Sequence, residues 1–559
     1  MGILQIAIVI LVLVLLVKPL GTYLYQVFRN ESNGTDRWFS WAEKPIFALI
    51  GLKERKGMTW KGYAVSFVLT NIVLVAAGYL ILRLQKVLPL NPNGIGHMEP
   101  TLSFNTIISF MTNTNLQHYS GESGLSYLAQ MAVITMMMFT SAATGLCVAI
   151  AFIRAVTSKG MTVGNFFEDF VKAHTRVFIP AAFIIAMALV ALQVPQTLKP
   201  TLSVTTLEGS EQQIAVGPVA ALESIKHLGT NGGGFMGANS SHPFENPSPL
   251  TNVIEILSMW CLGAALPYTF GLFAKSRKQG WIIFSVMMTL FIGFLSLNYA
   301  AETNGNPALN QLGIDASQGS MEGKEVRFGI AQSSLFTTVT TAATTGSVNN
   351  MHDTLTPLGG ITPLSLMMLN SVFGGKGVGL MNMLMYAILA VFLAGLMVGR
   401  TPEFLGRKIE AREMKLVAVV ILVHPLIILA PTALALMTDA GQAGIAHSGF
   451  HGISQVLYEY TSSAANNGSG FEGLADNTPF WNISTGLVML IGRYISMIAL
   501  LAVGGSLMRK QWVPETLGTF RTDNKLFAGI LIAVVLIIGA LTFLPVLVLG
   551  PIAEHLTIR

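Results

Sequence analysis

Long apolar runs, separated by short polar segments, recur along the whole chain. A helix that crosses the hydrocarbon core of a bilayer needs about 20 predominantly apolar residues. This pattern predicts an all-α polytopic membrane protein with about ten transmembrane helices. The runs that reach the required length are 3–27, 62–84, 126–153, 177–195, 251–274, 281–299, 378–398, 416–438, 484–507 and 526–549.

The first run, which begins MGILQIAIVILVLVLLVKPL, lacks a basic start and a small-residue cleavage site. We therefore expect an uncleaved span and not a signal peptide. The aromatic-rich segment 37–52 follows it, and we expect an interfacial helix there, broken near Pro45.

Four loops on one side of the predicted membrane contain moderately apolar segments that are too short to span it. A helix of 11 residues is about 16 Å long, roughly half of the hydrocarbon core. We therefore expect four re-entrant half-helices. Their sequences are SFNTIISFMTNTN (103–115), PVAALESIKHLGTNGGG (218–234), SSLFTTVTTAATTGS (333–347) and GISQVLYEYTSSAANNGSG (452–470).

Each of these segments ends in a small polar cluster rich in Asn, Thr and Gly. The third positions of the clusters are 117, 114 and 122 residues apart. This regular spacing predicts four membrane–pore–membrane repeats with pseudo-fourfold symmetry, plus one extra helix at each end. The clusters are Asn113-Thr114-Asn115, Thr230-Asn231-Gly232, Thr344-Thr345-Gly346 and Asn466-Asn467-Gly468.

The repeats divide the chain into six parts. These are 1–61 (first transmembrane helix and cytoplasmic interfacial segment), 62–153 (repeat 1, pore loop 103–117), 177–274 (repeat 2, pore loop 218–234), 281–398 (repeat 3, pore loop 333–347), 416–507 (repeat 4, pore loop 452–470) and 526–559 (last transmembrane helix and outer C-terminus).

The composition of the clusters indicates an ion filter. Irregular backbone at membrane depth is tolerated where it is buried in protein or lines a watery cavity. Backbone carbonyls there can replace the hydration shell of a cation, and the negative C-terminal ends of the half-helices point toward the pore centre. No Asp or Glu lies in any cluster. Divalent cations are usually met by carboxylates, so we expect a monovalent cation.

The distribution of charged residues along the chain predicts the membrane topology. Only 11% of the chain is Asp, Glu, Lys or Arg, against about 25% in soluble proteins. This excludes a soluble enzyme, a disordered chain and a nucleic-acid binder. Of the 33 Lys and Arg residues, 23 lie in one alternating set of loops, 28–61, 154–176, 274–280, 399–415 and 508–525. The positive-inside rule assigns these loops to the cytoplasm, so both termini face outward. The net charge of +5 then requires no acidic partner.

Three ionisable residues within or beside the spans are candidates for function, because such residues are costly in a membrane. Arg493 lies near the middle of its span and is expected to line the pore or tunnel. The alternative is a structural pairing with carbonyls or with Glu255. Glu255 lies near the outer end of its span, where an interfacial position is expected. Lys376 lies in the glycine-rich stretch before residue 378, as a gate or as a structural plug.

The cysteines and histidines predict no metal centre. Cys147 and Cys261 lie in separate spans, so neither a disulfide nor a cysteine-ligated metal is expected. The histidines, among them His118, His227, His242 and His451, are scattered over outer loops without metal-ligand spacing.

Several longer motifs closely resemble the KdpA family, the potassium-binding subunit of the bacterial Kdp potassium-transporting ATPase, and the similarity runs over essentially the whole chain. The stretches that carry the resemblance are TNTNLQHYSGE (112–122), GTNGGGFMGANSSHPFENP (229–247), MEGKEVRFG (321–329), GRTPEFLGRKIEAREMK (399–415) and SSAANNGS (462–469).

The resemblance implies a subunit of a bacterial cell membrane that selects extracellular K⁺. The ion would then pass through an intramembrane tunnel to the P-type ATPase subunit KdpB, with KdpC and the small KdpF completing the complex. ATP would be hydrolysed on KdpB. The GTNGGG motif of this chain lacks the Lys-Ser/Thr of a phosphate-binding loop, so neither ATP nor another cofactor is expected here.

The resemblance also implies roles for individual residues. The filter would consist of the four clusters, in which Asn115 stands where the other three clusters have glycine. Gln117, Ser120 and Gly233 would support the filter or line its vestibule. Asn370 and Lys376 stand where relatives have Glu and a small residue, and with Arg493 they are candidates for the pore, the tunnel or its gate.

Two other functions compete with this one. A stand-alone potassium channel or symporter could have the same fold, but SHPFENP and MEGKEVRFG resemble KdpA only. An intramembrane enzyme would need a convergent set of catalytic groups, and Glu255, Lys376 and Arg493 do not form one.

Overall fold

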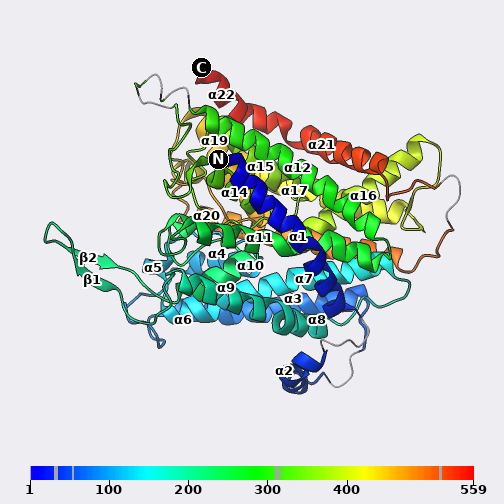
Figure 1. Ribbon diagram of the computed structural model, residues 1–559, viewed down its shortest axis with the longest axis horizontal. Coiled ribbons are helices and arrows are strands. Elements are labelled where there is room, and N and C mark those ends of the chain that lie inside the picture. The colour runs from blue at the N-terminus through cyan, green and yellow to red at the C-terminus, as the bar shows by residue number, and fades with distance from the viewer. Residues whose placement is uncertain are drawn as a thin grey trace.

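The protein is a bundle of long helices surrounding a core of shorter ones (Figure 1). The computed structural model describes residues 2–29, 36–52, 56–306, 309, 312–313, 317–514 and 519–558. Within these residues, ten helices are long and apolar enough to cross a membrane, and each overlaps one of the ten predicted runs. The predicted class, an all-α polytopic membrane protein, is therefore confirmed. The ten are α1 (Gly2–Phe28), α3 (Trp60–Leu84), α6–η1–α7 (Tyr127–Ala129, Gln130–Thr135, Met136–Thr157), α8–η2–α9 (Phe166–Lys172, Ala173–Phe178, Ile179–Ala191), α11 (Pro249–Phe273), α12 (Arg277–Asn304), α16 (Val378–Met397), α17 (Ala411–Met437), α20 (Pro479–Leu507) and α21–η4–α22 (Lys525–Leu547, Val548–Ile552, Ala553–Thr557).

The long helices begin where a short polar side chain can cap them. Thr59, Thr478 and Asn524 each accept a hydrogen bond from a backbone N–H in the first turn of α3, α20 and α21. Ser248 forms a reciprocal capping box with Thr251 at the start of α11. Such caps satisfy backbone donors that have no partner within the helix.

Four shorter helices lie inside the bundle, and nearly all of their residues are buried. They are α4 (Pro100–Met111), α10 (Val219–Leu228), α14 (Gly329–Ala342) and α19 (Gly449–Ala465). Each is followed directly by one of the four polar clusters. These helices are half as long as the spans or slightly longer. Each therefore ends inside the bundle, and the chain leaves the bundle again as irregular backbone.

The helix α15 (Pro357–Leu369) was not predicted from the sequence, where the second span of repeat 3 was assigned to 378–398 alone. Asn298 donates to the carbonyl of Gly359 at 3.0 Å, and Thr362 donates to that of Phe294 at 3.1 Å, so α15 packs along α12. The chain then leaves helical geometry over 370–377 and resumes as α16. This second span is therefore two helices with an irregular stretch between them.

The two halves of this span differ in most of their neighbours. The helix α15 packs against α12, α14 and α19, α16 packs against α7 and α11, and α21 packs along both. In the most hydrophobic window of α6–η1–α7, 89% of the residues are buried, against 17% in that of α1. The former is therefore a central helix, and the latter leaves most of its apolar surface for lipid.

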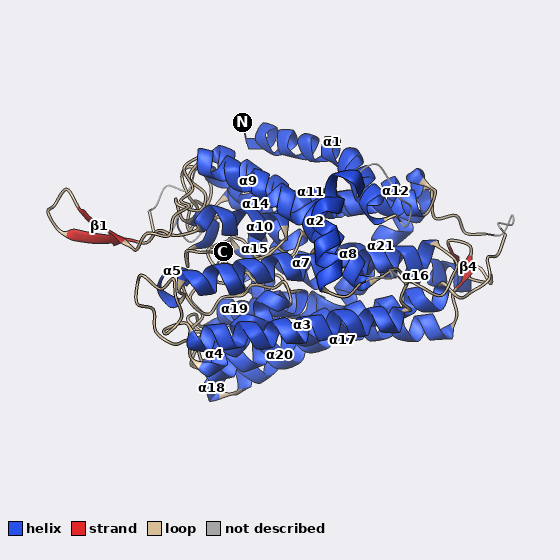
Figure 2. Cartoon of the chain, turned by 90° about the horizontal axis from the view of Figure 1, so that it is seen from below, coloured by secondary structure: helices blue, strands red, loops and turns tan. Residues whose placement is uncertain are grey.

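The remaining elements lie at the two ends of the bundle. The β1–β2 hairpin (Leu202–Thr205, Glu211–Ile214) projects from one end, and β3–β4 (Glu403–Phe404, Arg407–Lys408) lies at the other (Figure 2). Both chain ends lie in the half that carries the β1–β2 hairpin. The short elements there are α5 (Gly121–Gly124), η3 (Asn239–Ser241) and α18 (Asp439–Gln442).

The segment predicted to be interfacial forms α2 (Asp36–Leu49), set apart from the bundle in Figure 1. The predicted break near Pro45 is wrong, because the helix continues through that residue. Arg176 anchors α2 through hydrogen bonds of 2.6 Å to Glu43 and 2.6 Å to Asp36.

Candidate ion-binding site

The four half-helices end in the same backbone motif. The residue that begins each cluster has a positive φ: 62° at Asn113, 50° at Thr230, 46° at Thr344 and 56° at Asn466. The N–H of the next residue then bonds to the carbonyl five residues earlier, at 2.9, 2.7, 2.7 and 2.9 Å, respectively. This is the 6→1 bond of a Schellman helix end. The four clusters therefore share a backbone conformation in addition to their regular spacing in the sequence.

None of the four left-handed residues is glycine. A positive φ is unusual for a β-branched residue such as Thr230 or Thr344. Strained conformations of this kind persist when the surrounding structure holds them, and they gather at functional sites. At the third positions, Asn115, Gly346 and Gly468 are again left-handed, whereas in repeat 2 the left-handed residue is Gly233, one position later.

The four clusters converge on one point, which Gly232 marks. A Cβ atom added to Gly232 would lie 2.9 Å from the carbonyl oxygen of Thr345, 3.0 Å from that of Thr114 and 3.1 Å from that of Asn467. These three are the middle residues of the other clusters. A side chain at Gly232 would therefore stand among carbonyl oxygens from all three other clusters. We call this arrangement the carbonyl ring.

Side-chain amides bind neighbouring clusters together. The amide nitrogen of Asn113 donates to the carbonyl of Thr230 at 2.7 Å, and that of Asn231 donates to the Asn113 side-chain oxygen at 2.9 Å. On the other side, Asn466 donates to the Thr114 hydroxyl at 2.9 Å. These bonds direct Asn and Thr side chains into the scaffold, which leaves backbone carbonyls to face the centre.

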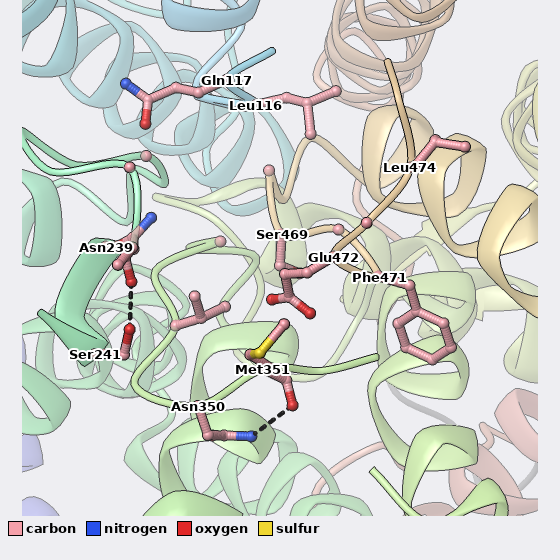
Figure 3. Close-up of a pocket in the computed structure, with 18 of the residues that line it drawn as sticks. Leu116, Gln117, Asn239, Ser241, Asn350, Met351, Ser469, Phe471, Glu472 and Leu474 are labelled. Atoms are coloured by element: carbon pink, nitrogen blue, oxygen red, sulfur yellow. Dashed lines mark hydrogen bonds between the residues drawn. The ribbon is translucent and has the colours of Figure 1, made fainter. Parts of the chain in front are cut away.

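A cavity of about 450 Å³ leads to the ring, with Asn115, Gly233, Gly346 and Gly468 among its lining residues. We call it the vestibule. Figure 3 shows Leu116 and Gln117 on one wall, with Met351 and the Glu472 carboxylate across the cavity. Gln117 pairs with Gly234 in both directions, at 3.1 and 2.9 Å, and so holds cluster 1 to the loop after cluster 2.

Two of the three predicted support residues, Gln117 and Gly233, line the vestibule, and Ser120 lies behind it. A Cβ atom on Gly233 would lie 2.9 Å from the Gln117 side chain, so glycine allows the two chain segments to approach each other. Ser120 lies close against Gly237, farther from the ring. All three predicted supports therefore belong to the contact between repeats 1 and 2.

Acidic residues outnumber basic ones among the described residues that line the vestibule. Glu325, Glu459, Glu472 and Asp476 line it, while the one lysine among them, Lys324, is paired with Glu302 at 2.6 Å. A cleft lined by one sign of charge concentrates counter-ions. The vestibule is therefore suited to collecting cations.

His118 lies behind this acidic wall. Its Nε2 atom is 3.4 Å from Glu459 and 3.7 Å from Asp476, and its Nδ1 is 2.7 Å from the Asn482 side-chain oxygen. Burial lowers the pKa of His118, but the two carboxylates and these hydrogen bonds together raise it to about 9. The imidazolium therefore offsets part of the negative charge beside the ring.

The far side of the carbonyl ring is closed by residues 370–377, which we call the floor. The N–H of Gly375 donates to the Thr344 hydroxyl at 2.7 Å, and that of Lys376 donates to the Thr230 hydroxyl at 3.1 Å. Asn370 donates to the carbonyl of Ala465 at 3.4 Å, just before cluster 4. The irregular stretch of the third repeat is thus bonded to the residues that carry the ring.

Arg493 lies at this floor. Its guanidinium donates to the Ser141 carbonyl at 3.5 Å, and a Cβ atom on Gly145 would lie 2.7 Å from it and 2.6 Å from the Lys376 carbonyl. The Lys376 ammonium points away, to the Met259 carbonyl at 3.2 Å. The three candidates Asn370, Lys376 and Arg493 therefore lie together on one side of the carbonyl ring.

Known proteins identify the family. The profile of the KdpA family, described as "Potassium-transporting ATPase A subunit", matches residues 7–556. The chain belongs to the KdpA family. It is 64% identical over 555 residues to a Geobacillus kaustophilus protein named "Potassium-transporting ATPase potassium-binding subunit", covering 99% of both chains. Among solved structures, it resembles the potassium transporter TrkH from Vibrio parahaemolyticus with a TM-score of 0.53 and 14% identity. That match covers 88% of this chain and 97% of the other, and it shows a shared fold.

Glu255, which was expected at the membrane interface, is buried inside this KdpA-family chain. It is 1% exposed, with its carboxylate 3.4 Å from Nε2 of His227. It belongs to a buried charged cluster in which Lys226 contacts Glu223 and Glu245, each at 2.8 Å. Glu245 lies in the loop after cluster 2, so this cluster pins that loop to α10. Sequence position alone did not show that the loop folds back over the end of the span.

The histidines also differ from expectation. His447 and His451 are four residues apart, which is a metal-ligand spacing, and both contact Asp353. The motif HSGFH was visible in the sequence, but its carboxylate partner lies about a hundred residues away and could not be paired with it from sequence alone.

Proposed function

We propose that this chain is the potassium-binding and translocating subunit of an ATP-driven potassium uptake complex. Potassium would enter the vestibule, lose its hydration shell at the carbonyl ring and continue past the floor to a neighbouring subunit. The name of the Geobacillus relative, as a potassium-binding subunit of a transporting ATPase, supports this proposal.

The observation that carries the proposal is the convergence of the four clusters. Carbonyl oxygens of Thr114, Thr345 and Asn467 surround the position of Gly232. Rings of backbone carbonyls substitute for the hydration shell of a monovalent ion, and without formal charge they also let it leave. We propose the twelve cluster residues as the filter, with the three support residues in its vestibule.

The position of the floor supports a role in passing the ion on. A cation that leaves the carbonyl ring meets the backbone of Gly375 and Lys376 and the guanidinium of Arg493. We propose that Arg493, Lys376 and Asn370 control this step. The positive charge of Arg493 would repel a cation that stays between the ring and the floor. The break in the helix at 370–377 would allow the floor to move.

The rest of the complex would supply the energy. We propose that a P-type ATPase subunit (KdpB) hydrolyses ATP and receives the ion, and that KdpC and a KdpF-type subunit complete the assembly in the bacterial inner membrane. This chain would itself be non-hydrolytic. The charge asymmetry of the loops supports placing both termini and the vestibule outside.

A stand-alone channel or symporter is not favoured. The likeness to TrkH concerns the fold, whereas the family match covers residues 7–556. One experiment distinguishes the two functions. The chain is purified from membranes through an affinity tag, and the associated proteins are identified and their ATPase activity is measured. A bound P-type ATPase with K⁺-stimulated hydrolysis is expected. Potassium flux through the chain alone, with no associated ATPase, would establish the rival function.

A further inference from the structure

A compact group of metal-ligating side chains lies outside the ring and the floor. His451 lies in the first turn of α19, His447 lies two residues before that helix begins, and Asp353 lies in the loop that follows cluster 3. One ligand atom from each of the three residues lies within 4.8 Å of the other two. The loop and the helix come from different repeats, so folding brings the ligands together.

The ligand atoms face one another. Nε2 of His447 lies 2.9 Å from Oδ2 of Asp353, and Nε2 of His451 lies 3.0 Å from Oδ1. A tetrahedral Zn²⁺ with bonds of about 2.0–2.2 Å separates its ligand atoms by about 3.3 Å. The two contacts use different carboxylate oxygens, and the set with one ligand atom per residue spans up to 4.8 Å. Side-chain adjustments of up to about 1.5 Å would bring the three ligand atoms to tetrahedral separations.

A fourth residue orients the central histidine. Nδ1 of His451 lies 2.9 Å from Oε1 of Glu554, on α22 near the C-terminus. Metal-ligating histidines almost always donate their other ring N–H to a carboxylate or carbonyl, which fixes the tautomer that presents the free nitrogen to the metal. Glu554 is therefore placed as an outer-shell partner for a metal on Nε2.

The site is accessible. The side chain of His447 is 41% exposed and that of His451 is 21% exposed, whereas Asp353 is 10% exposed. Two imidazoles and one carboxylate leave a fourth tetrahedral position for water, and imidazole-rich sites select Zn²⁺-class ions over Mg²⁺ or Ca²⁺.

We infer that His447, His451 and Asp353 form a binding site for a divalent transition-metal ion of the zinc class, with Glu554 as its outer-shell partner. A bound ion joins three segments that are distant in sequence: the loop after cluster 3, the start of α19 and α22. It also lies next to the vestibule wall. The N–H of Asp353 donates to Glu472 at 3.0 Å, and the His451 ring stacks on Phe471 at 5.8 Å between centroids.

The test is direct metal binding to the assembled complex, purified through a tag without histidine and stripped with a chelator. Co²⁺ is titrated and followed by its visible absorption, and Zn²⁺ is then added in competition. The wild type is expected to bind one more Co²⁺ with a tetrahedral spectrum than the His447→Ala variant. Because outer-shell partners typically contribute 10–100-fold to affinity, Glu554→Gln is expected to weaken that site by at least about tenfold.

The matched control is His97→Ala, which removes another outer histidine that bonds only to the Arg83 carbonyl in the described part of the chain. It should bind Co²⁺ like the wild type. Thermal unfolding gives a second readout, since Zn²⁺ should raise the midpoint of the wild type and of His97→Ala but not of His447→Ala. Equal Co²⁺ stoichiometry and affinity in the wild type and in a folded His447→Ala complex would overturn the inference.

Discussion

Replacing Gly232 by alanine adds one methyl group at the centre of the carbonyl ring. The new Cβ would lie 2.9–3.1 Å from three carbonyl oxygens, closer than an ordinary van der Waals approach of about 3.4 Å or more. Gly232 does not have a positive φ, so alanine brings no backbone strain, and its effect comes from the space it fills. The ring must widen by a few tenths of an ångström, or the ion must give up part of its coordination.

The expected size of the effect follows from the coordination that the ion gives up. Hydrogen bonds to charged groups are worth about 1.5–3 kcal/mol each, and we take the same magnitude for one contact between a carbonyl oxygen and K⁺. Weakening the site by one such interaction corresponds to a roughly 10- to 100-fold weaker apparent affinity for K⁺, since about 1.4 kcal/mol is tenfold. Selectivity for K⁺ over larger alkali cations should fall as well, because a widened ring coordinates larger ions better than the wild-type ring does.

The assay is K⁺-dependent ATP hydrolysis by the purified complex, measured over a range of K⁺ and Rb⁺ concentrations. The matched control is Gly529→Ala, because a Cβ on that α21 glycine meets nothing within 4 Å. The control should keep the wild-type KM for K⁺. Loss of one interaction should weaken the affinity for K⁺ by roughly tenfold or more. If Gly232→Ala assembles normally and its KM for K⁺ stays within about twofold of the wild-type value, the assignment of the carbonyl ring is refuted.

Three further changes test other parts of the molecule. Arg493→Gln should lower maximal transport by roughly tenfold or more, since it removes the positive charge below the ring, while the KM for K⁺ changes less. Asp169→Asn should destabilise the complex by about 3–5 kcal/mol, measured by thermal unfolding, because it breaks a buried bidentate pair with Arg154 at 2.7 and 3.0 Å. The raised pKa of His118, about 9 against an unfolded value near 6.5, contributes stability below pH 6.5 that is lost as the pH rises through 9. The unfolding midpoint should therefore fall more between these pH values in the wild type than in His118→Gln.

Each of these predictions has a contrary result. Wild-type uptake by Arg493→Gln would favour a purely structural role for the guanidinium. For the ion pair, Asp523→Asn is the control, since Asp523 meets Lys278 at 3.7 Å on the surface and should cost under about 1 kcal/mol. Equal destabilisation in both variants would contradict the argument from burial. Parallel pH profiles for the wild type and His118→Gln would remove His118 as the titrating group.

The spans could be predicted because membrane crossing depends on length and apolar composition, which are local properties of sequence. The positions of the polar clusters could also be located from their spacing, because each follows a short apolar segment and the intervals of 117, 114 and 122 residues are similar. The sequence could not show which carbonyls approach one another. The meeting of Thr114, Thr345 and Asn467 around Gly232 depends on long-range packing.

The misses have specific physical causes. The helix α15 has 13 residues, too few to qualify as a span, and the glycine-rich stretch after it looked like the end of a loop. The burial of Glu255 could not be seen from its distance to the span end, because its partner His227 comes from α10. The spacing of His447 and His451 was local and readable, but a metal site also needs Asp353, which only the fold supplies.

The interruption between α15 and α16 has a mechanical consequence. An unbroken helix behaves as a rod, so tilting one end moves the other. Here α15 is held by α12, α14 and α19, and α16 by α7 and α11, with α21 packed along both and the floor between them. A tilt of α16 relative to α15 would therefore act first on the hydrogen bonds that Gly375 and Lys376 donate to the Thr344 and Thr230 hydroxyls, beside the carbonyl ring.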